Sequence, residues 1–595
     1  MSKALWYFKL FNSIKDTQEA NFAALELESL FGRVRRVRNF VDILDNTMFG
    51  LFKSLRVQDL LAHELPYGEC HGFIGEQNPR EVLILTLMKR LAYIREIFIV
   101  STSSFPINVG VEGKNRQSFQ SGKHHLVRYI TNQYFLEKSQ YISKISRDEN
   151  EVDRNVETLF GFLVTKSNRI PASSSLAVGK RLEDYFAIRE EPSLYLAHYI
   201  HPYKGKFHPK LVRALLNYVI PSDKVLVLDN FAGSGTLLLE ACWLGLNSVG
   251  TDINPLSKLT SVVKCASLTL DPKMLKNAIE KYIKTLEDSK PIRVDGPNRW
   301  QTRPHHRNDI EDELNDLPKA ITVALTPSII ESIIRARETI RVTTNDQFAD
   351  FILIGLAGTI SDLVRRKEGD FLGVLRERLM HLYLRVYLFD RINDVLKINL
   401  GKSKTYQMDC RKMKGIRTET IDAIINSPPY STALDYLRND LPQLTLLRLA
   451  DLAKIESKMI GNPNFKVYPD NILQEMTEGK PAYSLLPEEG KMVLKELVEG
   501  GRRKEAIRSY RFFVDMQAVI GEMYRVLKPG CKCVMIVGNN HFKVASGNYI
   551  EIRNDQVITS LAKRTGFKED MVIRRDLEKS LTGMIRRESV IILHK

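Results

Sequence analysis

A turn that carries two glycines follows an apolar run in the string VLDNFAGSGT, residues 227–236. The run Val225–Leu228 predicts a buried parallel strand, and Leu237–Ala241 predicts the start of the helix behind the turn. Because Gly233 and Gly235 have no side chain, the backbone can bend there and a ligand can approach it closely. The first amide groups of the helix then point into the same crevice. The string therefore predicts a nucleoside-binding turn, and the lack of a following Gly-Lys-Ser/Thr excludes a Walker-type phosphate loop.

A second string, NSPPY at Asn426–Tyr430, follows the apolar run Ile421–Ile425, which predicts another strand. Its two prolines fix the backbone and cannot continue as a paired central strand. A backbone carbonyl at the Ser427–Pro428 pair can therefore face a ligand instead of a neighbouring strand. The Ser427 hydroxyl adds a second acceptor, and Tyr430 adds an aromatic face.

Two acceptors beside an aromatic face suit the chemistry of an exocyclic amino group on a nucleobase. Such an amine is a poor nucleophile because its lone pair is delocalised into the ring. Acceptors on its N–H groups draw the nitrogen toward tetrahedral geometry, which makes the lone pair available for in-line attack on an activated methyl group. An aromatic side chain can stack on the base once the base has left its helix. The predicted catalytic residues are Ser427, Pro428, Pro429 and Tyr430, and this chemistry requires no metal.

Two carboxylates follow other expected strands. Asp252 ends the run Val249–Asp252, where it can accept hydrogen bonds from both hydroxyls of a ribose, or alternatively cap the next helix. Asp409 follows a third expected strand within TYQMDCRKM, where it can accept from the amino group of an adenine. Its alternative reading is a residue of a surface turn.

Together these strings resemble the S-adenosylmethionine-dependent amino-methyltransferases of DNA, of the cytosine N4 and adenine N6 types. The resemblance covers residues 199–271 and 406–595, and it is also carried by YKGKFHPKLVRALL (203–216), DINPLSKL (252–259) and VLKPGCKCVMIVGNN (526–540). It implies an α/β fold with a doubly wound, Rossmann-like methyltransferase core, and S-adenosyl-L-methionine as the cofactor. The residues expected to bind this cofactor are Asp229, Phe231, Gly233, Gly235, Asp252 and Asp409.

Two positions refine this resemblance. Ser427 is the form more typical of cytosine N4 enzymes, whereas the adenine enzymes usually carry aspartate there, so the expected product is N4-methylcytosine in DNA, with N6-methyladenine as an alternative. Asn230 departs from the family, which usually has proline after the first aspartate of the glycine motif. The glycines and Phe231 are intact, so we expect cofactor binding to survive this change.

The N-terminal stretch YFKLFN…ALELESLFG resembles the start of the tRNA guanosine N2 methyltransferases, which place a separate RNA-binding region before the same motif order. Those enzymes usually carry aspartate at position 427, which favours DNA over tRNA as the partner of this chain. Because any bound base amine would use the same mechanism, the motifs alone leave tRNA open. A third reading, a non-catalytic nucleic-acid binder, is disfavoured because both motifs are intact.

Bulk composition agrees with a polyanionic partner. The chain has 595 residues, with 87 Lys+Arg against 71 Asp+Glu and a net charge of +16, which favours phosphate contacts, although a solvated basic surface would give the same count. No run of roughly 18 apolar residues and no signal-peptide layout is visible, so we expect a cytoplasmic protein without a membrane partner. The six cysteines are scattered, which predicts reduced thiols and no zinc site.

The order of motifs predicts four regions. They are an N-terminal α+β domain (1–190), the cofactor half of the core (195–271), a mainly helical insertion for target recognition (272–399), and the catalytic half (400–595) with a smaller insertion at about 442–507. Within them we expect a strand at Trp6–Phe11 and a helix at Ala20–Leu30. The basic stretches Arg33–Arg38 and Arg293–Arg307 are candidate nucleic-acid contacts, or else solvated surface.

Overall fold

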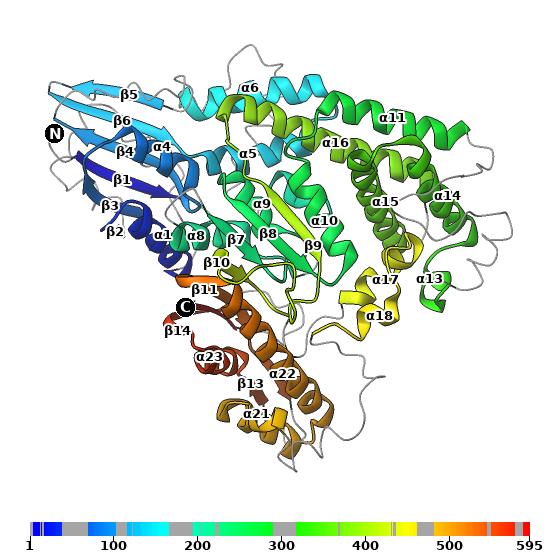
Figure 1. Cartoon of the computed structure of the whole chain (residues 1–595). Helices are drawn as coiled ribbons and strands as arrows, with labels where there is room; N and C mark the ends of the chain where they lie inside the picture. The colour runs from blue at the N-terminus through cyan, green and yellow to red at the C-terminus, as the bar shows by residue number, and fades with distance from the viewer. Residues whose placement is uncertain are drawn as a thin grey trace.

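The computed structural model of the chain contains two large β-sheets with helices packed around them (Figure 1). It describes residues 4–11, 14, 17–38, 69–102, 116–121, 123–165, 194–203, 205–220, 225–288, 317–366, 369–429, 431, 436–460, 481–543, 549–576 and 587–595. Tyr430 and the stretch Arg293–Arg307 lie outside these residues.

The larger sheet has seven strands, and it holds both motifs. Its spatial order is β14 (Lys568–Asp576), β15 (Arg587–His594), β11 (Leu527–Gly538), β10 (Ile421–Asn426), β7 (Leu226–Asp229), β8 (Asn247–Asp252) and β9 (Ser403–Gln407). The five strands from β11 to β9 pair in parallel, while β15 runs antiparallel to both β11 and β14. The predicted doubly wound α/β class is confirmed by this order.

The order along the sheet reverses between β7 and β10. The chain passes outward from β7 through β8 to β9, and then crosses back to lay β10 on the other side of β7. In open α/β sheets, ligands bind outside the carboxyl ends of the strands at such a switch point. The glycine turn follows β7 and the NSPPY string follows β10, so both motifs open into one crevice.

Both faces of this sheet are buried. Along β10, Ala423 and Ile425 join one apolar core while Ile424 joins the other, because successive side chains of a strand point to opposite faces. The first core is covered by α8 (Pro209–Val219), α9 (Thr236–Trp243) and α10 (Pro255–Ala266). The second is covered by α21 (Glu488–Glu499), α22 (Arg503–Val526) and α23 (Asn554–Thr565). Burial on both faces explains the continuous apolar runs that identified these strands.

The N-terminal region forms a six-stranded antiparallel sheet. Its order is β2 (Arg35–Val37), β3 (Gly72–Gln77), β1 (Ala4–Leu10), β4 (Ile94–Ser101), β6 (His124–Ile130) and β5 (Arg116–Ser121). Its helices are α1 (Thr17–Leu30), α4 (Glu81–Arg90), α5 (Asn132–Ile145) and α6 (Glu149–Thr165). The strand and the helix expected here are confirmed by β1 and α1. The basic stretch beginning at Arg33 includes the short edge strand β2, where Arg35 and Arg36 are exposed.

A set of helices follows α10 and precedes β9 in the sequence. They are α11 (Pro272–Asp288), α13 (Lys319–Ala324), α14 (Pro327–Thr343), α15 (Asp346–Arg366) and α16 (Phe371–Leu396). One helical stretch, Gln347–Arg366, is long and apolar enough to cross a membrane by composition, which the sequence reading had not anticipated. Since 78% of its apolar window is buried inside the protein, packing against α16 and α10 accounts for that composition.

Of the remaining described elements, one precedes α8 in the sequence and the others follow the NSPPY string. They are the 3-10 helix η2 (Leu196–Tyr199), α17 (Tyr436–Leu446), α18 (Leu452–Glu456), α20 (Pro481–Ser484), β12 (Asn540–Lys543) and β13 (Tyr549–Ile552). The last two pair as a separate hairpin.

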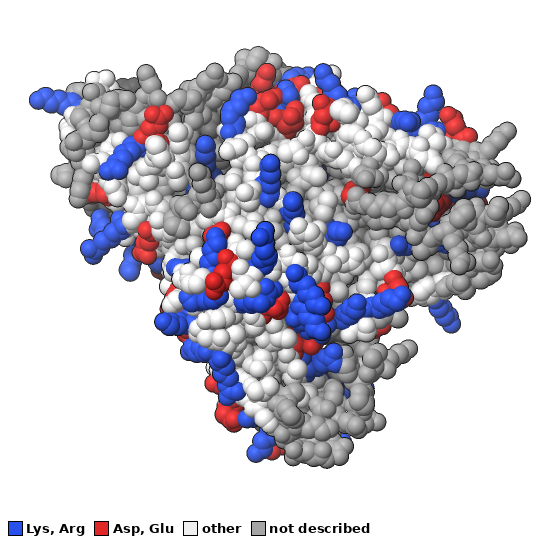
Figure 2. All heavy atoms as spheres, viewed as in Figure 1, with Lys and Arg blue, Asp and Glu red and all other residues white. Residues whose placement is uncertain are grey.

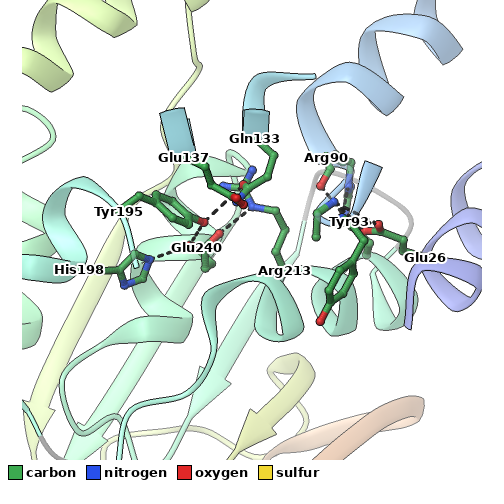
Figure 3. Close-up of polar contacts among 11 residues, drawn as sticks. Glu26, Arg90, Tyr93, Gln133, Glu137, Tyr195, His198, Arg213 and Glu240 are labelled. Atoms are coloured by element: carbon green, nitrogen blue, oxygen red, sulfur yellow. Dashed lines mark hydrogen bonds and ion pairs between the residues drawn. The ribbon is translucent and has the colours of Figure 1, made fainter. Parts of the chain in front are cut away.

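A buried polar network fixes the helix behind the glycine turn (Figure 3). Glu240 of α9 is fully buried and accepts hydrogen bonds from Arg213 Nε at 2.7 Å, His198 Nε2 at 2.8 Å and Tyr195 Oη at 2.6 Å. Burial raises the pKa of Glu240, but Arg213 and His198 outweigh it and hold the pKa below its usual value. The network therefore ties α9 to α8 and η2 through one ionised carboxylate.

A second network in the same view joins the N-terminal region to α8 (Figure 3). Glu26 of α1 accepts from the backbone amides of Ala92 and Tyr93, each at 2.9 Å, and from Asn217 Nδ2 at 2.9 Å. Arg90 Nε donates to Asn217 Oδ1 at 3.1 Å. Because the apolar core also runs without a break from the N-terminal sheet to β7, these two parts of the chain pack as one body.

Replacing Glu240 by alanine should destabilise the protein strongly. The change leaves Arg213 buried without its carboxylate, and removing one partner of a buried ion pair costs about 3–5 kcal/mol. Urea unfolding followed by circular dichroism measures this loss. The matched control is Glu331→Ala on α14, which breaks an exposed pair with Arg335 and should cost less than about 1 kcal/mol. Equal losses in the two variants would contradict the role given to Glu240.

Candidate functional site

A cavity of about 900 Å³, open to solvent, lies at the carboxyl ends of β7, β8 and β10. The predicted site residues that line it are Phe231, Gly233, Asp252, Asp409, Ser427 and Pro429. Asp229, Gly235 and Pro428 do not line it, and Tyr430 lies outside the described residues. The structure thus brings the residues of the two strings to one cavity although they are far apart in the chain.

Asp252 holds the glycine turn against the start of the next helix. Its Oδ2 accepts from the amide of Gly233 at 2.8 Å, and its Oδ1 accepts from the amide of Asn254 at 2.8 Å. Asn254 itself caps α10 through Leu256, so the capping role considered for Asp252 belongs to Asn254. A carboxylate offers about four acceptor positions, so two remain for hydroxyl groups of a ligand. Burial raises the pKa of Asp252 to about 6.

The two glycines have different structural roles. Gly233 adopts φ +48°, which would strain an added side chain, although its Cβ would make only an ordinary contact with the ring of Tyr203 at 3.4 Å. Gly235 adopts φ +74°, and a Cβ there would lie 2.8 Å from Ser261 of α10. Ser261 Oγ also donates to the Gly233 carbonyl at 3.0 Å. Gly233 therefore shapes the cavity wall, while Gly235 lets the turn pack closely against α10.

Asp229 lies below the cavity, almost completely buried at the end of β7. Its Oδ1 accepts from the amide of Phe231 at 3.1 Å. Burial raises the pKa of Asp229 to about 8, and the neighbouring Asp252 adds to the rise. Asp229 therefore supports the backbone that carries Phe231.

Asp409 is held by an arginine that the sequence reading did not single out. Arg411 donates from Nη2 to Asp409 Oδ2 at 2.8 Å, from Nη1 to Asp515 Oδ1 at 2.8 Å, and to the Lys458 carbonyl at 2.9 Å. Burial raises the pKa of Asp409, but the bonds from Arg411 outweigh it and hold the pKa below its usual value. Since Lys458 also lines the cavity, Arg411 fixes both this rim and the carboxylate.

Ser427 is oriented by the strand beside it. Its Oγ donates to the carbonyl of Ile536 in β11 at 3.0 Å, which directs the hydroxyl proton into the sheet. The oxygen lone pairs are then available as acceptors on the cavity side, as the predicted chemistry requires. Pro428 is buried, and Pro429 lines the cavity next to Ser427.

A pair of buried amides joins the two motifs directly. Asn426 Nδ2 donates to Asn230 Oδ1 at 2.6 Å, and both side chains are at most 1% exposed. The pairing of Leu228 with Ile424 places these residues opposite each other two positions further along the strands. Asn230 Nδ2 and Asn426 Oδ1 have no hydrogen-bond partner among the described residues, and Asn230 lines the cavity. The sequence flagged Asn230 as a departure from its family but gave no sign of this contact.

Models of known protein families give no match to the chain. Over 400 residues the chain is 24% identical to the Type II methyltransferase M.MvaI of Kocuria varians, spanning 62% of this chain and 81% of that protein. Over 135 residues it is 30% identical to a tRNA (guanine(10)-N2)-dimethyltransferase of Methanocaldococcus jannaschii, spanning 21% of this chain and 37% of that protein.

Among solved structures, a SAM-dependent methyltransferase of Methanosarcina mazei aligns with 64% of this chain and 96% of its own length. The identity is 10% and the TM-score is 0.23, so this alignment carries no argument. The fold assignment rests on the strand order described above.

Replacing Asn230 and Asn426 one at a time should cost more stability in sum than replacing both together. Asn426→Ala leaves the Asn230 side chain buried without a partner, and an unsatisfied buried polar group costs about 1–3 kcal/mol. Urea unfolding of Asn230→Ala, Asn426→Ala and the double variant completes a double-mutant cycle. We expect the double loss to be smaller than the sum of the single losses by at least about 0.5 kcal/mol. Strictly additive losses would show that the two amides do not interact.

Proposed function

We propose that this chain methylates cytosine N4 in DNA. Its relatives confirm the resemblance to nucleic-acid methyltransferases that its motifs indicated. The chain is an S-adenosylmethionine-dependent methyltransferase that acts on nucleic acid. The proposal concerns which base and which polymer it modifies, and which residues do the work.

The residues of the cavity fit S-adenosylmethionine. Asp252 retains acceptor positions for two ribose hydroxyls, the glycine turn lets the ligand approach the backbone, and Phe231 offers an aromatic wall. Asn230, whose Nδ2 has no hydrogen-bond partner among the described residues, also lines this cavity. The cofactor, when bound, supplies a methyl group activated by attachment to a sulfonium.

Ser427 and the carbonyl before Pro428 act on the incoming base. Both are acceptors, so they position the exocyclic amino group through its N–H groups and favour the tetrahedral nitrogen that attacks. No group of this site needs to form a covalent bond with the base. The observation that carries the proposal is that Ser427, oriented by Ile536, lines the same cavity as Asp252 and the glycine turn.

Serine at position 427 favours cytosine N4 over adenine N6, since a neutral acceptor here is the form more typical of the cytosine enzymes. A basic surface suits a nucleic-acid substrate of either kind: in Figure 2, Lys and Arg side chains gather across the middle of the visible face, near β10, β11 and the upper end of α22. The second candidate is tRNA guanine N2, which is supported by the relative that modifies tRNA.

The test is methyl transfer from labelled S-adenosylmethionine to genomic DNA and to bulk tRNA in parallel, followed by digestion to nucleosides and mass identification. N4-methylcytosine in the DNA is the expected product. N6-methyladenine would keep the mechanism and change the base. N2-methylguanosine in the tRNA would overturn the assignment to DNA.

Ser427→Ala should lower the rate of methyl transfer strongly, by about 10²-fold or more, because one of two acceptors on the amine is lost. Cofactor affinity, measured by calorimetry, should stay within about twofold, because this acceptor is assigned to the base and not to the cofactor. The control is Ser509→Ala, a buried hydroxyl on α22 that does not line the cavity. Near-normal turnover by Ser427→Ala would rule out its catalytic role.

Cofactor affinity should fall in acid through Asp252. Only the ionised carboxylate accepts from two hydroxyls, and burial raises the pKa of Asp252 to about 6. Affinity should therefore be constant above pH 7 and fall by about tenfold for each unit below pH 6. Calorimetry from pH 5 to 8 tests this, and Asp252→Asn should bind more weakly with a flat profile. A pH-dependent profile that persists in Asp252→Asn would assign the effect to another group.

A further inference from the structure

A second hollow adjoins the cofactor cavity and carries an excess of positive charge. It lies between the segment that follows η2 and the helices α15 and α16, and its empty volume is about 1320 Å³, including open solvent. We call it the basic groove and define it by Lys206, Arg365, Arg366, Arg378, His381 and Arg385. Its acidic lining residues are Asp362 and Glu377.

The arginines of the groove divide into paired and unpaired groups. Arg365 and Arg378 both contact the carboxylate of Asp362, so one acidic side chain serves two guanidinium groups. Arg366 and Arg385 form no ion pair with any carboxylate in the described part of the chain. The groove therefore keeps positive charge that its own acidic residues do not neutralise.

Arg385 is a partly buried cation with few polar contacts. Its guanidinium is half-buried over the ring of Tyr199, 5.0 Å from the centroid, and within the described part of the chain its hydrogen bond is to Gln140 Oε1 at 3.4 Å. Burial lowers the pKa of Arg385 to about 10, and the nearby Arg378 adds to that effect. A desolvated cation is costly unless it is paired, and an anion entering the groove would remove that cost.

The floor of the groove supplies further polar groups. Lys206 Nζ donates to the carbonyls of His198 at 3.0 Å and His201 at 2.9 Å, which leaves one of its three protons for a ligand. His201 lines the groove and is 2% exposed, and its Nδ1 has no partner among the described residues. An unpartnered buried nitrogen beside several cations indicates a site built for a polar ligand.

The basic groove adjoins the cofactor cavity. Tyr203 and Lys206 line both the groove and the cofactor cavity. Tyr203 also lines a third hollow, with Arg365 and residues of α17 such as Asp440, and α17 is the helix that follows the NSPPY string. A chain of phosphates in the groove would therefore pass Tyr203 and Lys206, which line the same cavity as Ser427.

We propose that the basic groove binds the sugar-phosphate backbone of the DNA strand that carries the target base, an inference that rests on the proposed function of the adjoining cavity. Arginine donors match phosphate oxygens, and such contacts fix the register of a nucleic acid without reading its sequence. Repeated phosphates also suit a groove whose cations are spread over two helices and a connecting segment. A single small anion would leave most of them unused.

The experiment measures binding of a fluorescently labelled 30-base-pair DNA duplex to the full chain by anisotropy, from 50 to 300 mM salt. The test variant is Arg366→Glu, at the exposed end of α15, with Arg366→Gln as a milder form. The matched control is Lys281→Glu, which makes the same change in charge at an exposed position of α11 outside the groove.

Arg366→Glu should bind DNA at least about tenfold more weakly at low salt, with the slope of log affinity against log salt reduced by about one. Lys281→Glu should bind within about twofold of the unchanged protein. Calorimetry with S-adenosylmethionine should give the same cofactor affinity for all variants, which shows that the fold and the cavity are intact.

Equal DNA binding by Arg366→Glu and Lys281→Glu would overturn the inference. So would a loss confined to bulk tRNA in a parallel titration, because the occupant would then be RNA. Methyl transfer by the unchanged protein separates this result from the proposed function. If the unchanged protein methylates DNA and Arg366→Glu binds DNA normally, the inference about the groove is wrong and the proposed function stands. If Arg366→Glu binds DNA weakly and the unchanged protein transfers no methyl group, the inference about the groove stands and the proposed function is wrong.

Discussion

The parallel pairing of β7 with β10 sets where every group of the site can lie. It places the glycine turn and the NSPPY string at neighbouring strand ends, so that one cavity is lined by Asp252 on one side and Ser427 on the other. The register of this pair also brings Asn230 opposite Asn426, and their buried hydrogen bond joins the motifs. A slip of one residue would turn each side chain to the other face of the sheet and separate the two halves of the site.

The apolar cores on both faces make that register stable, and buried polar groups hold the helices around it. Glu240 anchors α9 behind the turn, and Arg411 fixes Asp409 and the rim at Lys458. The bonds to Glu240 and Asp409 are buried or partly buried, so removing one partner leaves a desolvated charge. Glu240 and Arg411 do not line the cavity themselves. That support keeps Asp252 and Ser427 in place before the cofactor and the base arrive.

Much of the fold was predictable because parallel strands buried on both faces leave continuous apolar runs, as at Ile421–Ile425. The cavity residues Phe231, Gly233 and Asp252 were predictable because their motif is local. Contacts between distant segments left no such signal: the partner of Asn230 and the pairing of Asp409 with Arg411 depend on tertiary packing. Gly235, predicted to bind the cofactor, does not line the cavity and packs against Ser261 of α10. The basic groove combines helices α15 and α16 with a segment far from them in sequence, so periodicity could not reveal it.

The amides of Asn230 and Asn426 are separated by 196 positions in the chain. Closing a flexible loop of that length opposes folding by roughly 5 kcal/mol, and contacts of this range form slowly. The helices α11 to α16 lie in this interval, and their folding shortens the loop that remains to be closed. The crevice is complete only when β7 and β10, far apart in the chain, have paired.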